Sequence, residues 1–568
     1  MKKTLSDLFA YFGQSFWEHY VSWTFLLTAT FTVLYALLIY FMQGDLFYVD
    51  TDCYTRALRI VDWLQDFRWQ EKIFPYTNHP DGFVLHFTRI CDVIWLIFTL
   101  PFLAFLPLKE AVFCGGFFFS PFFLFLTLSS FLWGIKPYMI SLNHRNGLFL
   151  TVFAFSFVFC CKLTTVFDFY RPDHHCIMCF VFSFCISTLL HSYLKPNPKE
   201  FFFAGILTGL GLWASSAPDG LYIALTVLLI LATDVIFSEK NTKNPLCYAL
   251  GFFYANLFAW LINPPFGGYA VTDNARLSII HVALSALMLA SFAAWHFGNF
   301  KGKFRQISSL GFFTVASILF MLILFGSTTL FAPVYTEEVK KYFIPCIREM
   351  SVLSYILMAP AAFGMIIASY MSFDKPHERC LAILYFVTAP LGICIARFYS
   401  YYLCVWMILY ACGLIFLFTK KDIDNKFKLA TFIYVVLPVF YLVSIDSRMG
   451  KSSDIELSGV VLANTFEGPE LVWRYNVDTV ASPYHTNVEG IKDNRTMWFT
   501  TDENELKELL KKREVNYITL KGVIKSEYYA SPKDNTDKLY GKVFTGKDIY
   551  PWMEKIDKRT YRVNYEKF

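Results

Sequence analysis

Long apolar runs recur along residues 1–445, and they constrain the fold more than any other feature of the sequence. A run of roughly 20 apolar residues is long enough to cross the hydrocarbon core of a bilayer as a helix. Short polar loops separate the runs, and the whole chain is 56% hydrophobic and only 17% charged. A water-soluble protein of this length needs more charge to cover its surface. The pattern therefore predicts a polytopic, mainly α-helical membrane protein.

The candidate spans are 22–42, 110–134, 147–164, 177–194, 201–216, 219–236, 246–262, 278–296, 310–331, 351–371, 378–396, 399–418 and 428–445. One further run, 91–108, is ambiguous because it contains Asp92, Pro101 and Pro107. The positions of lysine and arginine decide how this run is interpreted. If 91–108 lies flat on the outer face, the basic loops, such as 195–199 and 301–305, all fall on the cytoplasmic side, as the positive-inside rule expects.

This topology predicts about thirteen crossings. We expect the protein to lie in a bacterial inner membrane. The topology places its N-terminus in the cytoplasm and its C-terminal domain in the periplasm. The net charge of +5 lies largely on loop lysines and gives no indication of a nucleic-acid partner.

The composition changes after residue 445, because 446–568 is rich in Lys, Asp, Glu and Asn. This change predicts a soluble C-terminal domain of the α/β class, following a transmembrane domain over 1–445. Helical spacing at 503–512 and a following apolar stretch at 516–520 predict a helix and a strand. The segment 467–487 either docks this domain onto the helices or faces a site in the membrane domain.

Titratable residues gather in two predicted outer loops. The long first loop, 43–109, contains Asp50 and Asp52, and the second contains Asp173, His174 and His175. Carboxylates with few soft ligands suit a hard divalent cation such as Mg²⁺ or Mn²⁺, which can hold a phosphate. Asp50 and Asp52 also have a structural interpretation as turn or helix-cap residues, and one histidine as a hydrogen-bonding neighbour. Three titratable groups at a membrane boundary are costly without a role, which favours a functional site.

These motifs resemble the membrane glycosyltransferases of the GT-C fold, particularly the branch of the oligosaccharyltransferase catalytic subunit and its bacterial relatives. Asp52 followed by Cys53 and Tyr54 is similar to the first acidic motif of that family, and Asp173, His174 and His175 are similar to its second. Glu349 and Arg397 lie where the family places a metal-binding glutamate and an arginine that contacts the lipid phosphate. The resemblance covers most of 45–400.

The resemblance implies an inverting glycosyltransferase that takes a sugar from a polyprenyl-phosphate or -pyrophosphate donor on the extracytoplasmic side. It implies a divalent cation held by Asp52, Asp173, Glu349 and His175, with Asp52, Asp50 or Asp173 acting on the acceptor. The residues expected to contact substrate are Arg397, His174, Arg171, His86 and Arg89.

The acceptor stays open, as a lipid, a glycan or a protein, because the acceptor-recognition motif of the family, Trp-Trp-Asp-Tyr-Gly, does not occur after residue 446. The nearest aromatic cluster is Trp473, Arg474 and Tyr475. The alternative function is a secondary transporter of a small polar or lipid-linked solute. A transporter would carry its titratable residues near the bilayer midplane rather than in outer loops.

Overall fold

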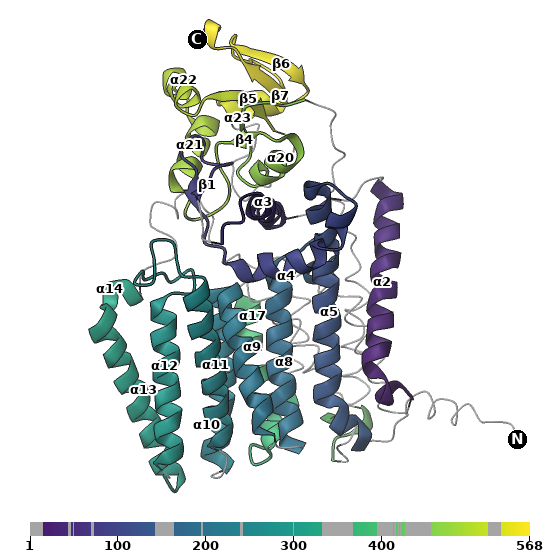
Figure 1. The fold of residues 1–568 in the computed structure, drawn as a ribbon, viewed down its shortest axis with the longest axis vertical. Helices are drawn as coiled ribbons and strands as arrows, with labels where there is room; N and C mark the ends of the chain where they lie inside the picture. Colours follow the sequence, from purple (N-terminus) through teal and green to yellow (C-terminus); the bar gives the residue numbers. More distant parts are fainter. Residues whose placement is uncertain are drawn as a thin grey trace, which may run out of the picture.

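A computed structural model describes most of the chain, and Figure 1 shows a bundle of long helices below a smaller unit that contains a sheet. The described residues are 15–43, 47–48, 50–69, 73–141, 164–194, 197–238, 242–298, 300–331, 367–394, 413, 416–417, 420, 422–426, 456–520 and 535–568. Two further elements, α3 (Thr51–Asp66) and α4 (Arg89–Thr99), lie between the bundle and the sheet unit (Figure 1).

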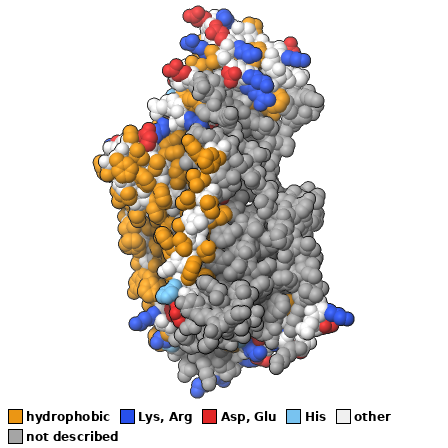
Figure 2. Space-filling view, turned by 90° about the vertical axis from the view of Figure 1, so that its right-hand side faces the viewer, with side chains coloured by type: hydrophobic (Ala, Val, Ile, Leu, Met, Phe, Trp, Pro, Cys, Tyr) orange, Lys and Arg blue, Asp and Glu red, His pale blue; other side chains and the backbone are white. Residues whose placement is uncertain are grey.

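The bundle contains helices that run roughly parallel to one another (Figure 1). They are α2 (Tyr20–Gln43), α5 (Leu108–Ser141), α8 (His174–Leu194), α9 (Pro198–Ala214), α10 (Leu221–Ser238), α11 (Lys243–Ile262), α12 (Ile279–Phe297), α13 (Lys303–Phe325) and α17 (Pro376–Cys394). Within the described residues, five helices are long and apolar enough to cross a membrane. Figure 2 shows hydrophobic side chains over the described surface of the bundle and charged side chains towards both ends. The chain is therefore an integral membrane protein by helix length and surface composition.

Each predicted span that falls on described residues coincides with one of these helices. The bounds differ most for the predicted span 310–331, since α13 begins at Lys303 and ends at Phe325. Gly326 follows α13 with a φ of 74°, a left-handed conformation that ends the helix. The predicted spans 147–164, 351–371, 399–418 and 428–445 lie wholly or largely outside the described residues, as does the domain boundary at 445. The number of about thirteen crossings therefore stays a prediction.

The segment predicted to lie flat does not form a spanning helix. Its first part is α4 (Arg89–Thr99), which runs across the end of the bundle in Figure 1. A short 3₁₀ turn, η1 (Phe102–Ala104), follows before α5 begins at Leu108. The indole Nε1 of the buried Trp95 donates to the carbonyl of Val112 at 2.9 Å, and this bond ties α4 to the first turns of α5.

Helix α8, which carries the second acidic motif, packs closely against α5. A Cβ atom added at Gly134 of α5 would lie 2.6 Å from the Cα of Ser187 in α8. A small residue is therefore required where the two backbones approach, as is common between membrane helices.

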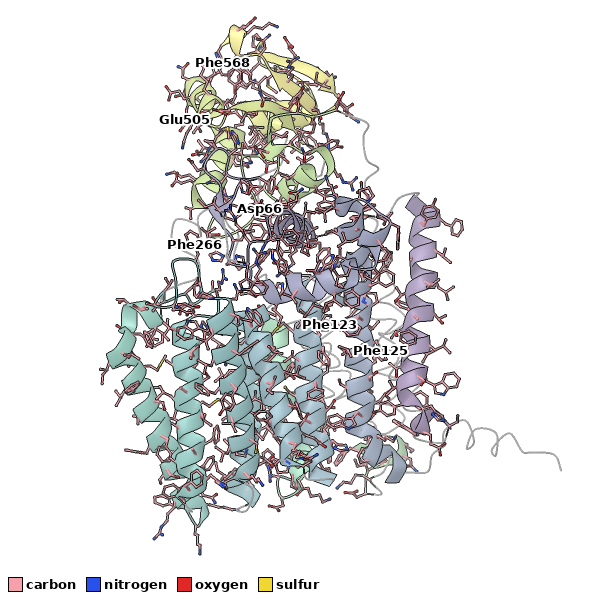
Figure 3. The ribbon with its side chains drawn as sticks, viewed as in Figure 1. Asp66, Phe123, Phe125, Phe266, Glu505 and Phe568 are labelled. Carbon is pink, nitrogen blue, oxygen red and sulfur yellow. The ribbon has the colours of Figure 1, made fainter. Side chains whose placement is uncertain are left out.

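The C-terminal residues form a five-stranded mixed sheet with helices. The strands are β3 (Val460–Leu462), β4 (Asp478–Thr479), β5 (Val515–Thr519), β6 (Met553–Asp557) and β7 (Thr560–Val563), in the order β4-β3-β5-β7-β6. The helices are α20 (Gly468–Tyr475), α21 (Val488–Phe499), α22 (Glu503–Lys512) and α23 (Leu539–Thr545). Helix α22 and strand β5 confirm the predicted helix and strand. Figure 3 shows Glu505 and Phe568 in this unit, well away from Phe123 and Phe125 of the bundle.

A hairpin from the first loop, formed by β1 (Ile73–Phe74) and β2 (Phe83–Val84), joins the edge of this sheet. Thr77 forms a parallel bridge with Thr479 of β4, and the amide of Thr479 donates to the carbonyl of Tyr76 at 2.9 Å. The hydroxyls of Thr77 and Ser482 are 2.9 Å apart. The first loop and the C-terminal unit are therefore joined through backbone as well as side-chain contacts.

Arg513 strengthens this junction from inside the C-terminal unit. Its side chain is 1% exposed, and its Nη2 atom lies 2.7 Å from the Asp493 carboxylate. Its Nη1 atom donates to the side-chain oxygen of Asn78 at 3.0 Å and to the carbonyl of His79 at 2.9 Å.

Replacing Arg513 with alanine is expected to lower the free energy of unfolding by about 3 kcal/mol, because it leaves Asp493 and two loop oxygens without their buried partner. Thermal unfolding of the detergent-purified chain measures this loss. Lys512 pairs with the same Asp493 carboxylate at 2.7 Å but is 53% exposed, so it is the matched control. Lys512→Ala should cost less than about 1 kcal/mol. Equal losses in the two variants would contradict a special role for Arg513 at the junction.

Candidate active site

The first part of the site is the N-terminus of α3 (Thr51–Asp66). Asp50 caps this helix, and its Oδ1 atom accepts a hydrogen bond from the amide of Asp52 at 3.1 Å. The cap fixes Asp52 in the first turn. Because residues four positions apart share a helix face, Arg56 lies on the same side as Asp52. The structural interpretation of Asp50 as a helix cap is therefore confirmed.

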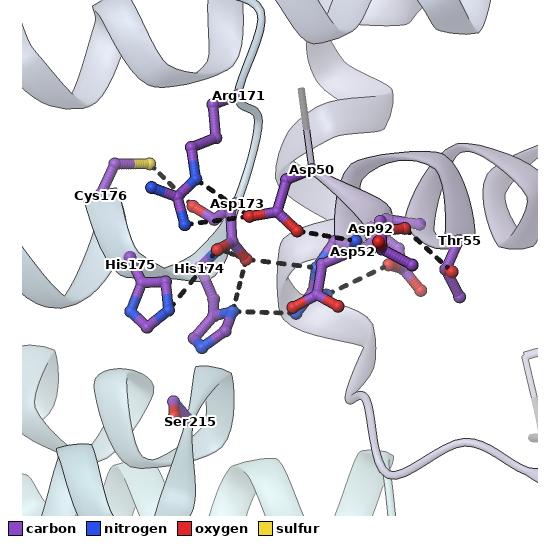
Figure 4. Close-up of polar contacts among 12 residues, drawn as sticks. Asp50, Asp52, Thr55, Asp92, Arg171, Asp173, His174, His175, Cys176 and Ser215 are labelled. Atoms are coloured by element: carbon purple, nitrogen blue, oxygen red, sulfur yellow. Dashed lines mark hydrogen bonds and ion pairs between the residues drawn. The ribbon is translucent and has the colours of Figure 1, made fainter. Parts of the chain in front are cut away.

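The second part of the site is the segment that leads into α8. Arg171 binds Asp50 through its Nη2 atom at 2.9 Å and its Nε atom at 3.2 Å. The hydroxyl of Ser120 in α5 donates to the carbonyl of Arg171 at 2.6 Å. These contacts hold the segment between α3 and α5, so that Asp173 and His174 face the first turn of α3 (Figure 4).

Asp173 and the two histidines form a compact group at the start of α8. The Nδ1 atom of His174 lies 2.5 Å from Oδ1 of Asp173, and Nε2 of His175 lies 3.6 Å from Oδ2. Asp173 is 1% exposed. Within the described part of the chain, its Oδ2 atom is buried and takes part in no hydrogen bond. A buried carboxylate oxygen without a hydrogen bond is costly, which favours a ligand at this position.

The carboxylates of the site influence one another. Burial, together with the nearby charges of Asp50 and Asp173, raises the pKa of Asp52 to about 7. Burial also opposes ionisation of Asp173, but the adjacent His174, His175 and Arg171 outweigh it and hold the pKa of Asp173 well below its usual range. The site therefore combines an ionised carboxylate, Asp173, with a second one, Asp52, that is only partly ionised near neutral pH and whose ionised form a nearby positive charge would favour.

This arrangement fits a divalent cation. Asp173, His174 and His175 each offer a ligand atom, and these atoms lie within 4.8 Å of one another. The Oδ2 atom of Asp173, which takes part in no hydrogen bond, and the carboxyl of Asp52 add oxygen donors whose charge a cation would offset. The donors are oxygen and imidazole nitrogen, a set that suits Mn²⁺ and Zn²⁺ as well as Mg²⁺.

The C-terminal unit contributes a side chain that the sequence did not single out for the site. The hydroxyl of Tyr484 is 2.9 Å from Oδ1 of Asp52 and 2.8 Å from Oγ1 of Thr55. Its ring stacks on Phe83 of the first-loop hairpin, with centroids 5.9 Å apart. The segment 467–487, for which docking and facing the site were alternatives, therefore does both.

The predicted substrate-binding residues lie in different places. The ring of His86 is 5.9 Å from the ring of Tyr484, at the edge of the site. Arg89 is directed elsewhere, since it binds Asp92 at 3.2 Å and the carbonyl of Trp69 at 3.2 Å. Glu349 and Arg397 fall outside the described residues. The structure therefore brings together Asp50, Asp52, Arg171, Asp173, His174 and His175, with His86 nearby.

A cavity of about 400 Å³ lies on the other side of Tyr54, between α3, the start of α5 and α20. Its walls include the aromatic rings of Phe113 and Trp473, which stack with centroids 6.2 Å apart. Lys109 lies over the Trp473 ring at 5.0 Å. The aromatic cluster around Trp473 thus lines a space that a ligand could fill.

Comparisons with known proteins rest on the three-dimensional structure. No model of a known protein family matches the sequence, and no curated protein matches it significantly. Among solved structures, the chain is similar to the oligosaccharyltransferase AglB from Archaeoglobus fulgidus in complex with an inhibitory peptide and a dolichol-phosphate. The TM-score is 0.64 at 14% identity, over 89% of this chain and 70% of the other.

Two further structures of the Archaeoglobus fulgidus oligosaccharyltransferase are also similar. One is tethered to an acceptor peptide containing the NVT sequon (TM-score 0.64, 15% identity, 89% and 69% of the chains). The other is a complex with Zn and sulfate (TM-score 0.61, 15% identity, 88% and 67%). At this identity the likeness concerns the fold, and it agrees with the resemblance drawn from the sequence motifs. The chain therefore has a GT-C-like fold related to that of the oligosaccharyltransferases.

Proposed function

We propose that the chain is an integral-membrane glycosyltransferase. In this proposal it transfers a sugar or oligosaccharide from a polyprenyl-(pyro)phosphate donor to an acceptor on the extracytoplasmic side, with inversion at the anomeric carbon. The observation that carries the proposal is the meeting of α3 and the start of α8. Asp52 and Asp50 of one element lie beside Asp173, His174 and His175 of the other, in a GT-C-like fold.

The place of these residues supports an enzyme over the alternative of a transporter. The described carboxylates of the site lie on α3 and in the segment before α8, at the end of the bundle next to the C-terminal unit. A transporter site is expected near the bilayer midplane. A site at the bundle end would instead suit a donor whose lipid lies in the membrane and whose sugar lies in water. The similar AglB structure contains a dolichol-phosphate, which supports a lipid-phosphate donor for this chain as well.

The proposed chemistry assigns a task to each group. A divalent cation held by Asp52, Asp173 and His175, with Glu349, would offset negative charge on the donor phosphate. Asp52 orients an acceptor hydroxyl and accepts its proton while the acceptor oxygen bonds to the anomeric carbon. The bond between that carbon and the phosphate oxygen breaks, and the phosphate leaves with the electron pair. Asp50 is the second candidate base, and Tyr484 holds the Asp52 carboxylate in place.

Cells with and without the gene provide the test of this function. Without the enzyme, a lipid-linked sugar should accumulate, and one envelope glycan, lipid or protein should lose the same sugar. Mass spectrometry of lipid extracts and of released glycans measures both changes, and the product that is lost identifies the acceptor. Restoring the wild-type gene should reverse both, whereas unchanged lipid-linked sugars and glycans in the deletion strain would contradict the proposal.

A further inference from the structure

A buried cluster of arginines around Asp92 lies directly behind the candidate active site. Asp92 of α4 is fully buried. Its Oδ2 atom lies 3.0 Å from Nη2 of Arg59 and 3.2 Å from Nη1 of Arg89, while its Oδ1 atom is 3.8 Å from Nη1 of Arg56. Three buried guanidinium groups thus share one buried carboxylate. Buried charges need such partners.

Arg56 connects this cluster to the site. Its Nη1 atom faces Asp92, and its Nη2 atom lies 3.4 Å from Nδ1 of His174. Its Nε atom lies 4.0 Å from Oδ1 of Asp173, at the limit of an ion pair. Its guanidinium also stacks on the ring of Phe87 at 4.1 Å. Arg56 is therefore placed between two buried carboxylates, Asp92 and Asp173.

We propose that Asp92 is a positioning residue that keeps Arg56 from occupying Asp173, so that the Asp173 carboxylate stays available to a divalent cation. The proposal rests on the proposed function, since it concerns the same cation site. If Asp92 loses its charge, Asp173 becomes the carboxylate that attracts Arg56, and the guanidinium closes from 4.0 Å to hydrogen-bond distance. A cation would then have to displace a bidentate arginine. The unbalanced charge of Arg59 would oppose the cation further.

The test is a titration of Mn²⁺ into the detergent-purified full-length protein, followed by electron paramagnetic resonance of the free ion. Asp92→Asn keeps the shape of the side chain and removes its charge. The dissociation constant of Mn²⁺ is expected to rise at least about tenfold, the range typical of groups that support metal ligands. Arg56→Gln, which removes the competitor, should bind Mn²⁺ as tightly as wild type or more tightly. The double variant should return to within about threefold of wild type.

Asp234→Asn is the matched control, since Asp234 in α10 also pairs with a buried arginine, Arg379 of α17, at 2.8 Å. If Asp92 had a purely structural role, Asp92→Asn and Asp234→Asn would both have a lower melting temperature, and the Mn²⁺ affinity of the folded fraction would be unchanged in both. That result, or weaker binding in Arg56→Gln, would overturn the inference even if Asp92→Asn fails to fold. Absence of Mn²⁺ binding to wild type would instead overturn the proposed cation site and the inference with it.

Discussion

Replacing Asp52 with alanine is expected to reduce sugar transfer from a lipid donor by about a thousandfold, because a positioned general base contributes roughly 10²- to 10⁴-fold. Asp52 is held by the cap of α3 on one side and by the hydroxyl of Tyr484 on the other. The rate of label transfer from a radiolabelled polyprenyl-phosphate sugar in membranes measures the effect.

Two further variants separate chemistry from folding. Asp52→Asn resembles the protonated carboxyl in shape and charge. Because the pKa of Asp52 is raised to about 7, the folded protein tolerates that neutral form, and the variant should stay folded yet inactive. Asp66 lies at the other end of α3 and is exposed, so Asp66→Ala should retain transfer (Figure 3). Transfer at a wild-type rate in Asp52→Asn would remove Asp52 from the mechanism.

Replacing Asp173 with asparagine should abolish both divalent-cation binding and transfer. Asp173 pairs with both histidines, and the pKa of its buried carboxyl is held well below the usual range by His174, His175 and Arg171, although burial opposes this. Its ionised form therefore stabilises the folded protein at pH values above the pKa of the unfolded chain, and this stabilisation is lost as the pH falls through the folded pKa. Asparagine removes that charge at every pH, so the melting temperature should fall together with Mn²⁺ affinity.

Asp273 provides a comparison for this variant because it lies in a different loop, between α11 and α12. Its Oδ1 atom accepts a local hydrogen bond from the amide of Ala275 at 2.8 Å. Asp273→Asn should retain Mn²⁺ binding and transfer. Mn²⁺ affinity at the wild-type level in Asp173→Asn would show that the cation, if one binds, is held elsewhere.

The features that the sequence predicted well depend on residues that are close together in the chain. Apolar runs predicted the bundle helices, and the helical spacing within 503–512 predicted α22. The motif of Asp173, His174 and His175 is a run of neighbours, so its members had to lie together. The cap formed by Asp50 is local as well, and it was one of the two interpretations that the sequence allowed.

The features that escaped prediction depend on contacts between distant segments. Tyr484 and Asp52 are separated by 432 positions, and nothing in the surroundings of Tyr484 points to an acidic partner. Asp92 was informative only as a reason why 91–108 does not cross the membrane. Its arginine partners on α3 become apparent when α3 and α4 are placed side by side. A single sequence does not specify such pairings, whereas it does specify helix periodicity.

Turnover of the donor by the purified protein tests the central claim most directly. The protein would be placed in lipid nanodiscs with a polyprenyl-phosphate sugar labelled in the sugar, together with a membrane extract as the source of acceptor. The proposed function predicts that label leaves the lipid only when a divalent cation is present, that a chelator stops it, and that Asp52→Asn and Asp173→Asn do not release it. The proposal would be contradicted if, for each candidate donor and with Mg²⁺ or Mn²⁺ supplied, label left the lipid no faster than it does in protein-free nanodiscs.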